Sequence, residues 1–148
     1  MQNLQTEADI ARKYLSKIAE IAERKFSEHL PPETDDPKNL HKAMRYSVFA
    51  GGKRLRPGLA YAAFELFKGK GESIWYATSA LEFLHTFSLI HDDLPCIDND
   101  DFRRGKQTAH KQFGEATAVM SGDALCVLAF ELIAKTENPK AMECLAHK

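Results

Sequence analysis

Apolar residues recur at helical spacing along almost the whole chain. Ile10, Tyr14 and Ile18, for example, stand four positions apart with charged residues between them. No segment alternates apolar and polar residues with the period of two that a half-buried strand requires. A chain patterned in this way buries its apolar surface by packing one helix against another. The sequence therefore predicts an all-α fold, and the short connections predict antiparallel helices in a bundle.

Prolines and glycines divide this pattern into helices. Pro31 ends the first helix, and Asp36 followed by Pro37 predicts an N-cap and a first helical residue. Gly51 is expected just past the end of the second helix. The last helix reaches the end of the printed sequence without a cap, which favours a chain that is part of a longer protein. The expected helices cover residues 4–29, 37–51, 57–69, 72–93, 115–134 and 140–148.

Size and charge exclude several classes of protein. With 148 residues, of which 44% are hydrophobic, the chain is long enough for one globular domain and too apolar for a disordered segment. Its 20 basic and 21 acidic residues give a net charge of −1, which argues against nucleic acid as a partner.

The sequence favours a soluble cytoplasmic protein. An odd number of cysteines without a CxxC pair predicts free thiols in a reducing compartment. Charged residues occupy the region where a signal peptide needs an apolar run, and we expect no uninterrupted apolar stretch of transmembrane length and no stable membrane insertion. The cysteines are Cys96, which is interpreted as a small loop residue, Cys126 and Cys144.

Residues 91–106 concentrate the charges of the chain. Five aspartates fall within residues 92–101, and three cations follow at positions 103, 104 and 106. Two like charges 4 Å apart repel by about 1 kcal/mol in water and by several times more in a partly dry cleft. A divalent cation such as Mg²⁺ relieves this repulsion, because it binds carboxylate oxygens together with substrate phosphate. The arginines predict a ligand that carries phosphate or diphosphate.

Asp92 and Asp93 are predicted to lie in the last turn of a helix, where the helix dipole disfavours negative charge. This local cost favours a functional role over a solvated helix end. Pro95 lets the chain turn, so that Asp98 can return toward the same cation. A calcium EF-hand beginning at Asp98 is excluded, because the required glycine and the terminal acid are missing.

A second cluster of cations lies in residues 51–57, whose sequence is GGKRLRP. The segment lacks the glycine spacing and the Ser/Thr of a P-loop. It still places Lys53, Arg54 and Arg56 on a glycine-hinged turn before a helix N-terminus, which is typical of an anion site. A solvated basic turn is the alternative interpretation.

His85 precedes Asp92 by two helical turns on the same face, which places it toward the charged helix end. We interpret His91 and His110 as structural. Asp123 lies in an otherwise apolar helix and is expected to be buried with a hydrogen-bond partner.

These residues resemble the N-terminal part of a trans-isoprenyl diphosphate synthase of the farnesyl/geranylgeranyl type. Residues 51–57 are similar to the GGKRxRP segment of that family. Asp92-Asp93-x-x-x-x-Asp98, followed by Arg103-Arg104-Gly105, resembles its first aspartate-rich motif with a two-residue insertion. Residues 81–86 and 113–116 also fit.

The resemblance implies an all-α, Mg²⁺-dependent prenyltransferase, homodimeric at full length, that joins isopentenyl diphosphate head to tail to an allylic diphosphate. Asp92, Asp93 and Asp98 would hold Mg²⁺ on the allylic diphosphate, and Arg103 would contact that diphosphate during catalysis. The residues that the resemblance assigns to the isopentenyl diphosphate are Gly52, Lys53, Arg56, His85 and Arg104.

In this family the residues just before the first aspartates set the product length. Phe87 and Ser88 therefore favour a short product, farnesyl diphosphate over geranylgeranyl diphosphate, although Phe87 is also compatible with an ordinary core position. The resemblance places a second aspartate-rich motif in a C-terminal half, and residues 1–148 contain none. They are expected to be the N-terminal portion of a single domain and to show no catalytic turnover on their own. A non-catalytic Mg²⁺-diphosphate-binding module is the main alternative, and a terpene cyclase is a weaker one.

Overall fold

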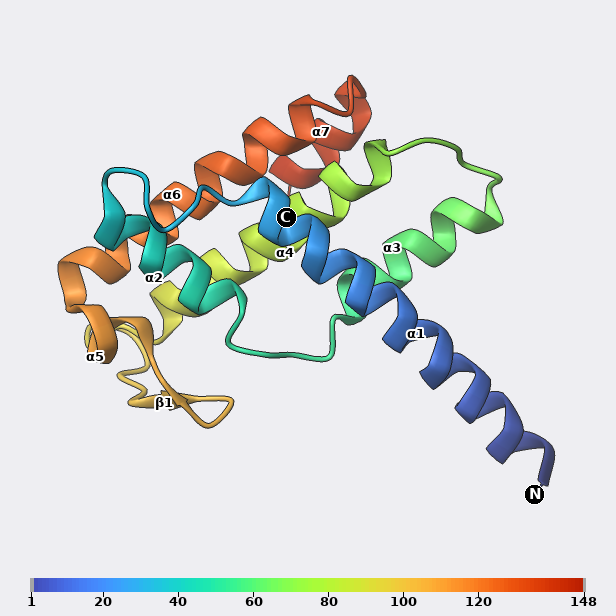
Figure 1. Cartoon of the computed structure of the whole chain (residues 1–148), viewed down its shortest axis with the longest axis horizontal. Helices are drawn as coiled ribbons and strands as arrows, with labels where there is room; N and C mark the ends of the chain where they lie inside the picture. The colour runs from blue at the N-terminus through green and yellow to red at the C-terminus, as the bar shows by residue number, and fades with distance from the viewer. Residues whose placement is uncertain (1, 148) are drawn as a thin grey trace.

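The central helix of the computed structural model is α4 (Ser73–Asp92), and other helices contact it from several sides (Figure 1). The structure describes residues 2–147, with side chains from residue 6 onward. The all-α prediction is confirmed. The elements in this part of the chain are α1 (Gln2–His29), α2 (Lys38–Val48), α3 (Leu55–Leu66), α4, β1 (Phe102–Arg103), β2 (Lys106–Gln107), α5 (Ala109–Phe113), α6 (Glu115–Ala134) and α7 (Pro139–Ala146).

α4 and α6 lie side by side in opposite directions, as Figure 1 shows. Both are apolar around most of their circumference, which is the composition of a buried helix. α1, α2 and α3 contact α4 as well, so the core forms around this helix. Phe26 of α1 packs on Phe83 of α4, with ring centroids 5.8 Å apart. The other large side chains that are fully buried in the core are Val48, Leu125 and Leu132.

Most helix starts differ from the prediction by one or two residues, and two of them change the expected N-cap or first turn. α2 begins at Lys38, and Pro37 rather than Asp36 is its N-cap. α3 begins at Leu55, two residues before Pro57, and its N-cap is Arg54 in a left-handed conformation. The proline is still within the first turn, where its missing N–H costs nothing. α3 also ends at Leu66, before Gly69, so the predicted helix is displaced toward the N-terminus by two to three residues.

A short hairpin and α5 lie in the region that was predicted to be an irregular charged loop. β1 pairs antiparallel with β2, and Phe102 is opposite Gln107. Arg104 and Gly105 form the turn with φ of 53° and 77°, the pattern of a type I′ turn. Strands of two residues are too short to show a period of two, which explains why the sequence did not reveal them. The hairpin projects Arg104 from its tip.

α6 is the one helix within residues 2–147 that is long and apolar enough to cross a membrane by length and composition. Acidic residues such as Asp123 and Glu131 interrupt its apolar run, so the expectation that no uninterrupted apolar stretch reaches this length is not contradicted. The signal is weak, because a core helix of a globular protein passes the same test, and α6 packs against α4, α2, α5 and α7.

Candidate diphosphate site

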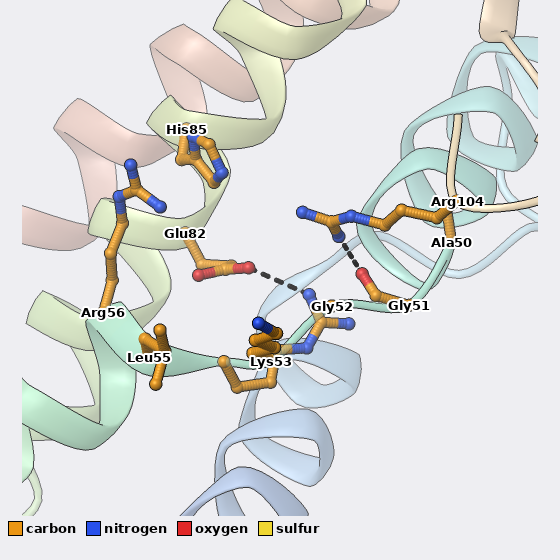
Figure 2. A pocket seen from close by; sticks show the side chains of 10 residues that line it. Ala50, Gly51, Gly52, Lys53, Leu55, Arg56, Glu82, His85 and Arg104 are labelled. Carbon is orange, nitrogen blue, oxygen red and sulfur yellow. Dashed lines mark hydrogen bonds and ion pairs between the residues drawn. The ribbon is translucent and has the colours of Figure 1, made fainter. Parts of the chain in front are cut away.

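The loop between α2 and α3, the start of α3, one face of α4 and the tip of the hairpin enclose a cavity of about 590 Å³. Figure 2 shows side chains from these four elements around it. Half of its ten lining residues are those that the family resemblance assigned to one diphosphate. They are Gly52, Lys53, Arg56, His85 and Arg104. The structure thus brings together residues that are up to 52 positions apart in the chain.

Glycine is favoured in the loop because of its backbone conformation. Gly51 and Gly52 have φ of 96° and 139°, a region that favours glycine. A Cβ on Gly52 would also overlap the guanidinium of Arg104. Arg104 donates a hydrogen bond from Nη1 to the carbonyl of Gly51, which joins the hairpin tip to the loop (Figure 2).

Arg54 differs from the two cations beside it. The sequence placed it with Lys53 and Arg56 on an anion-binding turn, but Arg54 is buried and the other two are exposed. Its guanidinium donates to Glu82 at 2.9 Å and to the carbonyl of Val48 at 2.8 Å. The interpretation of Arg54 as a third ligand-facing cation was therefore wrong. The signal for this role was Glu82, an acid within a mostly apolar helix that needs a buried cation.

The cavity therefore has more positive than negative charge. Its acid, Glu82, is paired with Arg54, whereas Lys53, Arg56 and Arg104 have no acidic partner there. Burial lowers the pKa of the His85 imidazole, and the nearby Arg56 lowers it further. Burial and Arg54 likewise lower the pKa of Arg104. Mutual repulsion of these cations is relieved when an anion binds, and guanidinium groups match phosphate oxygens well.

The acidic segment turns back on itself after α4, as expected. The N–H of Asp98 donates to the carbonyl of Asp92 at 2.8 Å, and the N–H of Asn99 donates to the carbonyl of Leu94 at 3.1 Å. The backbones of Asp92 and Asp98 are therefore adjacent, and both residues are exposed. Carboxylates are ligands that Mg²⁺ prefers, and this ion keeps further positions for water and substrate oxygens.

Asp93 has a different environment from the other two predicted metal ligands. Its side chain is buried and accepts two short hydrogen bonds at Oδ1 from Arg103, at 2.8 Å from Nε and 2.6 Å from Nη2. These bonds raise the pKa of Arg103. Within the part of the chain that the structure describes, no three acidic, histidine or cysteine side chains are grouped closely enough to hold a metal ion. The predicted Mg²⁺ site is therefore not preformed, and Asp93 would have to leave Arg103 to join it.

The acidic end of α4 is next to the cationic cavity. A small second cavity between α2, α4 and the hairpin is lined by Asp93, Arg103 and Arg104, among others. Arg104 and Ala50 belong to both cavities. Arg104 therefore lies between the two predicted diphosphate positions.

An apolar groove of about 900 Å³ lies on the other side of the cationic cavity. Arg56 and His85 line both spaces. Phe87 and Ser88, the predicted chain-length residues, face this groove, and the Phe87 ring meets the His91 ring edge-on at 4.7 Å. Phe87 is thus partly buried at the wall of a groove rather than in the closed core.

The residues interpreted as structural have mixed outcomes. His91 packs between α4 and α6, where Gly122 leaves room for its ring. His110 is buried, with Nδ1 3.1 Å from the hydroxyl of Thr108. Asp123 was expected to be buried, but its side chain is 55% exposed and lies 3.8 Å from Nε2 of His91. It lies on the same exposed side of α6 as Met120 and Val127, and because this side is apolar the sequence did not indicate that Asp123 is exposed.

The three cysteines are free thiols. Cys96 and Cys144 are exposed, and Cys126 is partly buried. Burial raises the pKa of the Cys126 thiol, which makes it less reactive. Cys96 lies in the turn after Pro95, as a small loop residue would.

The fold and the site together define a helical protein with a positively charged pocket that suits an anion. An acidic helix end and an apolar groove lie beside this pocket. Residues 37–148 match the sequence profile of the family described as "Polyprenyl synthetase". The chain belongs to this family, and the expected resemblance is confirmed.

Characterised proteins agree with this assignment. The chain is 51% identical over 124 residues to geranylgeranyl pyrophosphate synthase 4 of Arabidopsis thaliana, which covers 84% of this chain and 33% of that protein. It is 58% identical over 97 residues to a dimethylallyltranstransferase of Fischerella ambigua, covering 66% of this chain and 28% of the relative. The chain therefore spans about a third of the length of the curated relatives it matches.

Solved structures show the same fold over about half of their length. An FPP/GFPP synthase from Zymomonas mobilis superposes with a TM-score of 0.82 at 43% identity and covers 95% of this chain and 50% of that one. A geranyltranstransferase from Thermotoga maritima superposes with a TM-score of 0.83 at 40% identity, covering 90% and 49%. The prediction of an isoprenoid synthase fold is thus confirmed for the part present here.

Proposed function

We propose that this chain binds the two diphosphates of a head-to-tail prenyl transfer, isopentenyl diphosphate in the cationic cavity and an allylic diphosphate at the acidic end of α4. One observation carries the proposal. Lys53, Arg56 and Arg104, from three different elements, converge on a cavity without an unpaired acid. Such a cavity suits a small polyanion, and the adjoining acids suit the metal of a second one.

The proposed chemistry assigns each cluster one task. Lys53, Arg56 and Arg104 hold the isopentenyl diphosphate, with Gly52 and His85 beside it. Asp92 and Asp98, joined by Asp93 once it leaves Arg103, would hold Mg²⁺. When bound, Mg²⁺ stabilises the negative charge that grows on the departing allylic diphosphate.

The remaining residues act on the allylic substrate. Arg103, released from Asp93, contacts the departing diphosphate and stabilises its charge. The apolar groove beside Phe87 holds the hydrocarbon chain and excludes water from the allylic cation.

We propose a short product, farnesyl diphosphate, from the bulk of Phe87 in the groove. The names of several relatives, geranylgeranyl pyrophosphate synthases, favour the longer product. Titration with dimethylallyl, geranyl and farnesyl diphosphate in the presence of Mg²⁺ separates the two. If the product is short, the wild-type chain binds dimethylallyl and geranyl diphosphate but not farnesyl diphosphate. The variant Phe87→Ala is then expected to bind farnesyl diphosphate as well. Equal binding of all three by the wild-type chain supports the longer product.

A second copy of the chain is the proposed partner for the outer face of α6. Met120 and Val127 are 56% and 70% exposed there and lie on the same side of the helix two turns apart, so they form an apolar patch of the kind that marks an interaction site. This supports the homodimer that the resemblance implies. Sedimentation equilibrium measures it: a dimer that Val127→Lys dissociates is the expected result, and a wild-type monomer at all concentrations contradicts it.

Calorimetry with isopentenyl diphosphate tests the proposed function. Wild type is expected to bind, and Lys53→Ala/Arg56→Ala is expected to weaken binding about 100-fold, the loss of two charge-assisted contacts. Lys140→Ala, which removes an exposed cation of α7, is the matched control and leaves the affinity unchanged. A transfer assay with residues 1–148 then distinguishes an enzyme from a module that binds both diphosphates without joining them.

A further inference from the structure

We propose that Arg54 is a positioning residue of the cationic cavity. Its buried guanidinium fixes the loop that carries Lys53 and Arg56 at one distance from the face of α4 that carries His85. This inference rests on the proposed function, because it assigns to Arg54 the geometry of the isopentenyl diphosphate site. Arg54 itself contacts no ligand.

The contacts of Arg54 involve all three nitrogens of its guanidinium. Nη1 donates to Glu82 of α4 at 2.9 Å, Nη2 donates to the carbonyl of Val48 at the end of α2 at 2.8 Å, and Nε donates to Glu23 of α1 at 3.1 Å. The side chains of Arg54 and Glu82 are 2% and 5% exposed. The ring of Phe26 lies 5.6 Å from the guanidinium carbon. One side chain from the loop thus ties three helices together.

The backbone at Arg54 fits this role. Its φ is +48°, a left-handed conformation that is uncommon for a residue with a side chain. The conformation directs Arg54 inward while Lys53 and Arg56, on either side, remain exposed at the cavity. A lysine could supply the charge but not three donors in a fixed plane, so the geometry depends on arginine.

Glu82 connects this clamp to the site. It lies one helical turn before His85 on α4, and both residues line the cavity, as Figure 2 shows. The ion pair therefore sets the spacing between the basic loop and His85. It also neutralises the carboxylate of Glu82, which would otherwise repel a diphosphate from the cavity wall.

The test separates positioning from charge and from folding. Arg54→Met/Glu82→Met removes both members of the buried pair, a replacement that usually preserves stability when the apolar groups have similar volume. Arg54→Lys keeps the charge and loses the fork. Arg45→Met is the matched control, since Arg45 also ties α2 to carbonyls of residues 27, 30 and 31 but lies outside the cavity.

Two measurements are made on each folded variant: hydrogen exchange of the amides in residues 50–56, and calorimetry with isopentenyl diphosphate and with inorganic pyrophosphate. The double variant is expected to exchange faster in this loop and to bind both ligands about tenfold more weakly. Arg54→Lys is expected to show an exchange rate and an affinity between those of the double variant and those of wild type. Arg45→Met is expected to match wild type in both.

The outcomes are distinct. If wild type binds and the folded double variant shows the same affinity and loop exchange, the positioning role is overturned while the proposed function stands. If the double variant does not fold, Arg54→Lys decides: unchanged affinity and exchange overturn the role. If wild type binds neither ligand, the proposed function fails, and this inference fails with it.

Discussion

Arg103 donates hydrogen bonds from Nη2 and Nε to Oδ1 of Asp93, at 2.6 and 2.8 Å. Its guanidinium therefore lies where the sequence predicts a metal ion. The pair joins the end of α4 to the first strand of the hairpin. Without metal or diphosphate, the arginine is the cation that balances a buried acid. In the proposed function, binding of Mg²⁺ with an allylic diphosphate would require an exchange, in which Asp93 turns to the metal and Arg103 to the diphosphate. The two predicted roles of these residues are therefore coupled.

Removing Arg103 is expected to destabilise the chain and to make its stability depend on Mg²⁺. Arg103→Gln leaves Asp93 buried without its cation, at a cost of about 2 kcal/mol in the free energy of unfolding. Millimolar Mg²⁺ should recover part of this loss, because the metal can take the place of the guanidinium. Denaturant unfolding with and without Mg²⁺ measures both effects.

The control for this experiment is Lys111→Gln, which breaks the exposed ion pair with Asp101 and should cost at most about 0.5 kcal/mol. Equal losses in the two variants, or no response of Arg103→Gln to Mg²⁺, would show that Arg103 does not substitute for the metal.

Substitution of Asp92 or Asp98 should weaken binding of the allylic diphosphate and leave binding of isopentenyl diphosphate unchanged. Asp92→Asn or Asp98→Asn removes a proposed Mg²⁺ ligand, and Mg²⁺-dependent binding of geranyl diphosphate is expected to weaken at least about tenfold. Isopentenyl diphosphate binding should not change, because its cavity contains neither residue. Asp101→Asn, in the same segment, is the control. Calorimetry in matched buffers gives the affinities, and equal losses for both diphosphates argue against separate sites.

Binding of isopentenyl diphosphate should be linked to proton uptake by His85. Burial and Arg56 lower the pKa of free His85 below its usual value of about 6.5, and a bound polyanion raises it again. Between the two pKa values the complex binds more protons, so affinity rises as the pH falls through this interval. Calorimetry in buffers of different ionisation enthalpy counts the protons. On binding isopentenyl diphosphate, His85→Gln should take up fewer protons than wild type. If both take up the same number, His85 is not the group that is protonated.

Stability should fall in mild acid partly because of His29. Burial lowers the pKa of His29, whose Nδ1 lies 2.8 Å from the hydroxyl of Ser79 and whose ring stacks on Tyr76. The unfolded chain, with a pKa near 6.5, then binds more protons than the folded one, so this stability is present above pH 6.5 and is lost as pH falls below it.

The measurement for His29 is denaturant unfolding between pH 5 and 8. His29→Gln should flatten the fall in stability below pH 6.5, whereas His147→Gln, at an exposed position, should not. A curve for His29→Gln that parallels wild type would exclude a contribution from His29.

Tyr14 should contribute to the pH dependence of stability at alkaline pH. Partial burial and the hydrogen bond that it donates to Glu65 at 2.6 Å raise its pKa to about 12. The folded state therefore holds this proton more tightly, and the associated stability is present below pH 10 and lost as pH rises toward 12. Ultraviolet titration is expected to show one tyrosine ionising late, and Tyr14→Phe should remove that step.

Much of the fold and of the cationic cavity could be predicted from the sequence. Helical spacing and the breaks at proline and glycine identified the longer helices, because both signals are local. The cavity could be predicted because Lys53, Arg56, His85 and Arg104 belong to motifs of recognisable order.

The remaining features depend on contacts between distant segments. Arg54 looks like its basic neighbours in sequence, and only the position of Glu82 on α4 shows why it is buried. Asp93 looks like Asp92, and its pairing with Arg103 depends on a hairpin too short to leave a pattern. Asp123 was misplaced because the exposed side of α6 is itself apolar, so hydrophobicity did not indicate which side faces inward.

The most direct test of two diphosphate sites in one chain is a sequential titration. Residues 1–148 are first saturated with isopentenyl diphosphate without metal, and geranyl diphosphate is then added with and without Mg²⁺. We expect isopentenyl diphosphate to bind in the absence of metal, and geranyl diphosphate to bind afterward only when Mg²⁺ is present. Competition between the two ligands for one site, or binding of neither, would contradict the account.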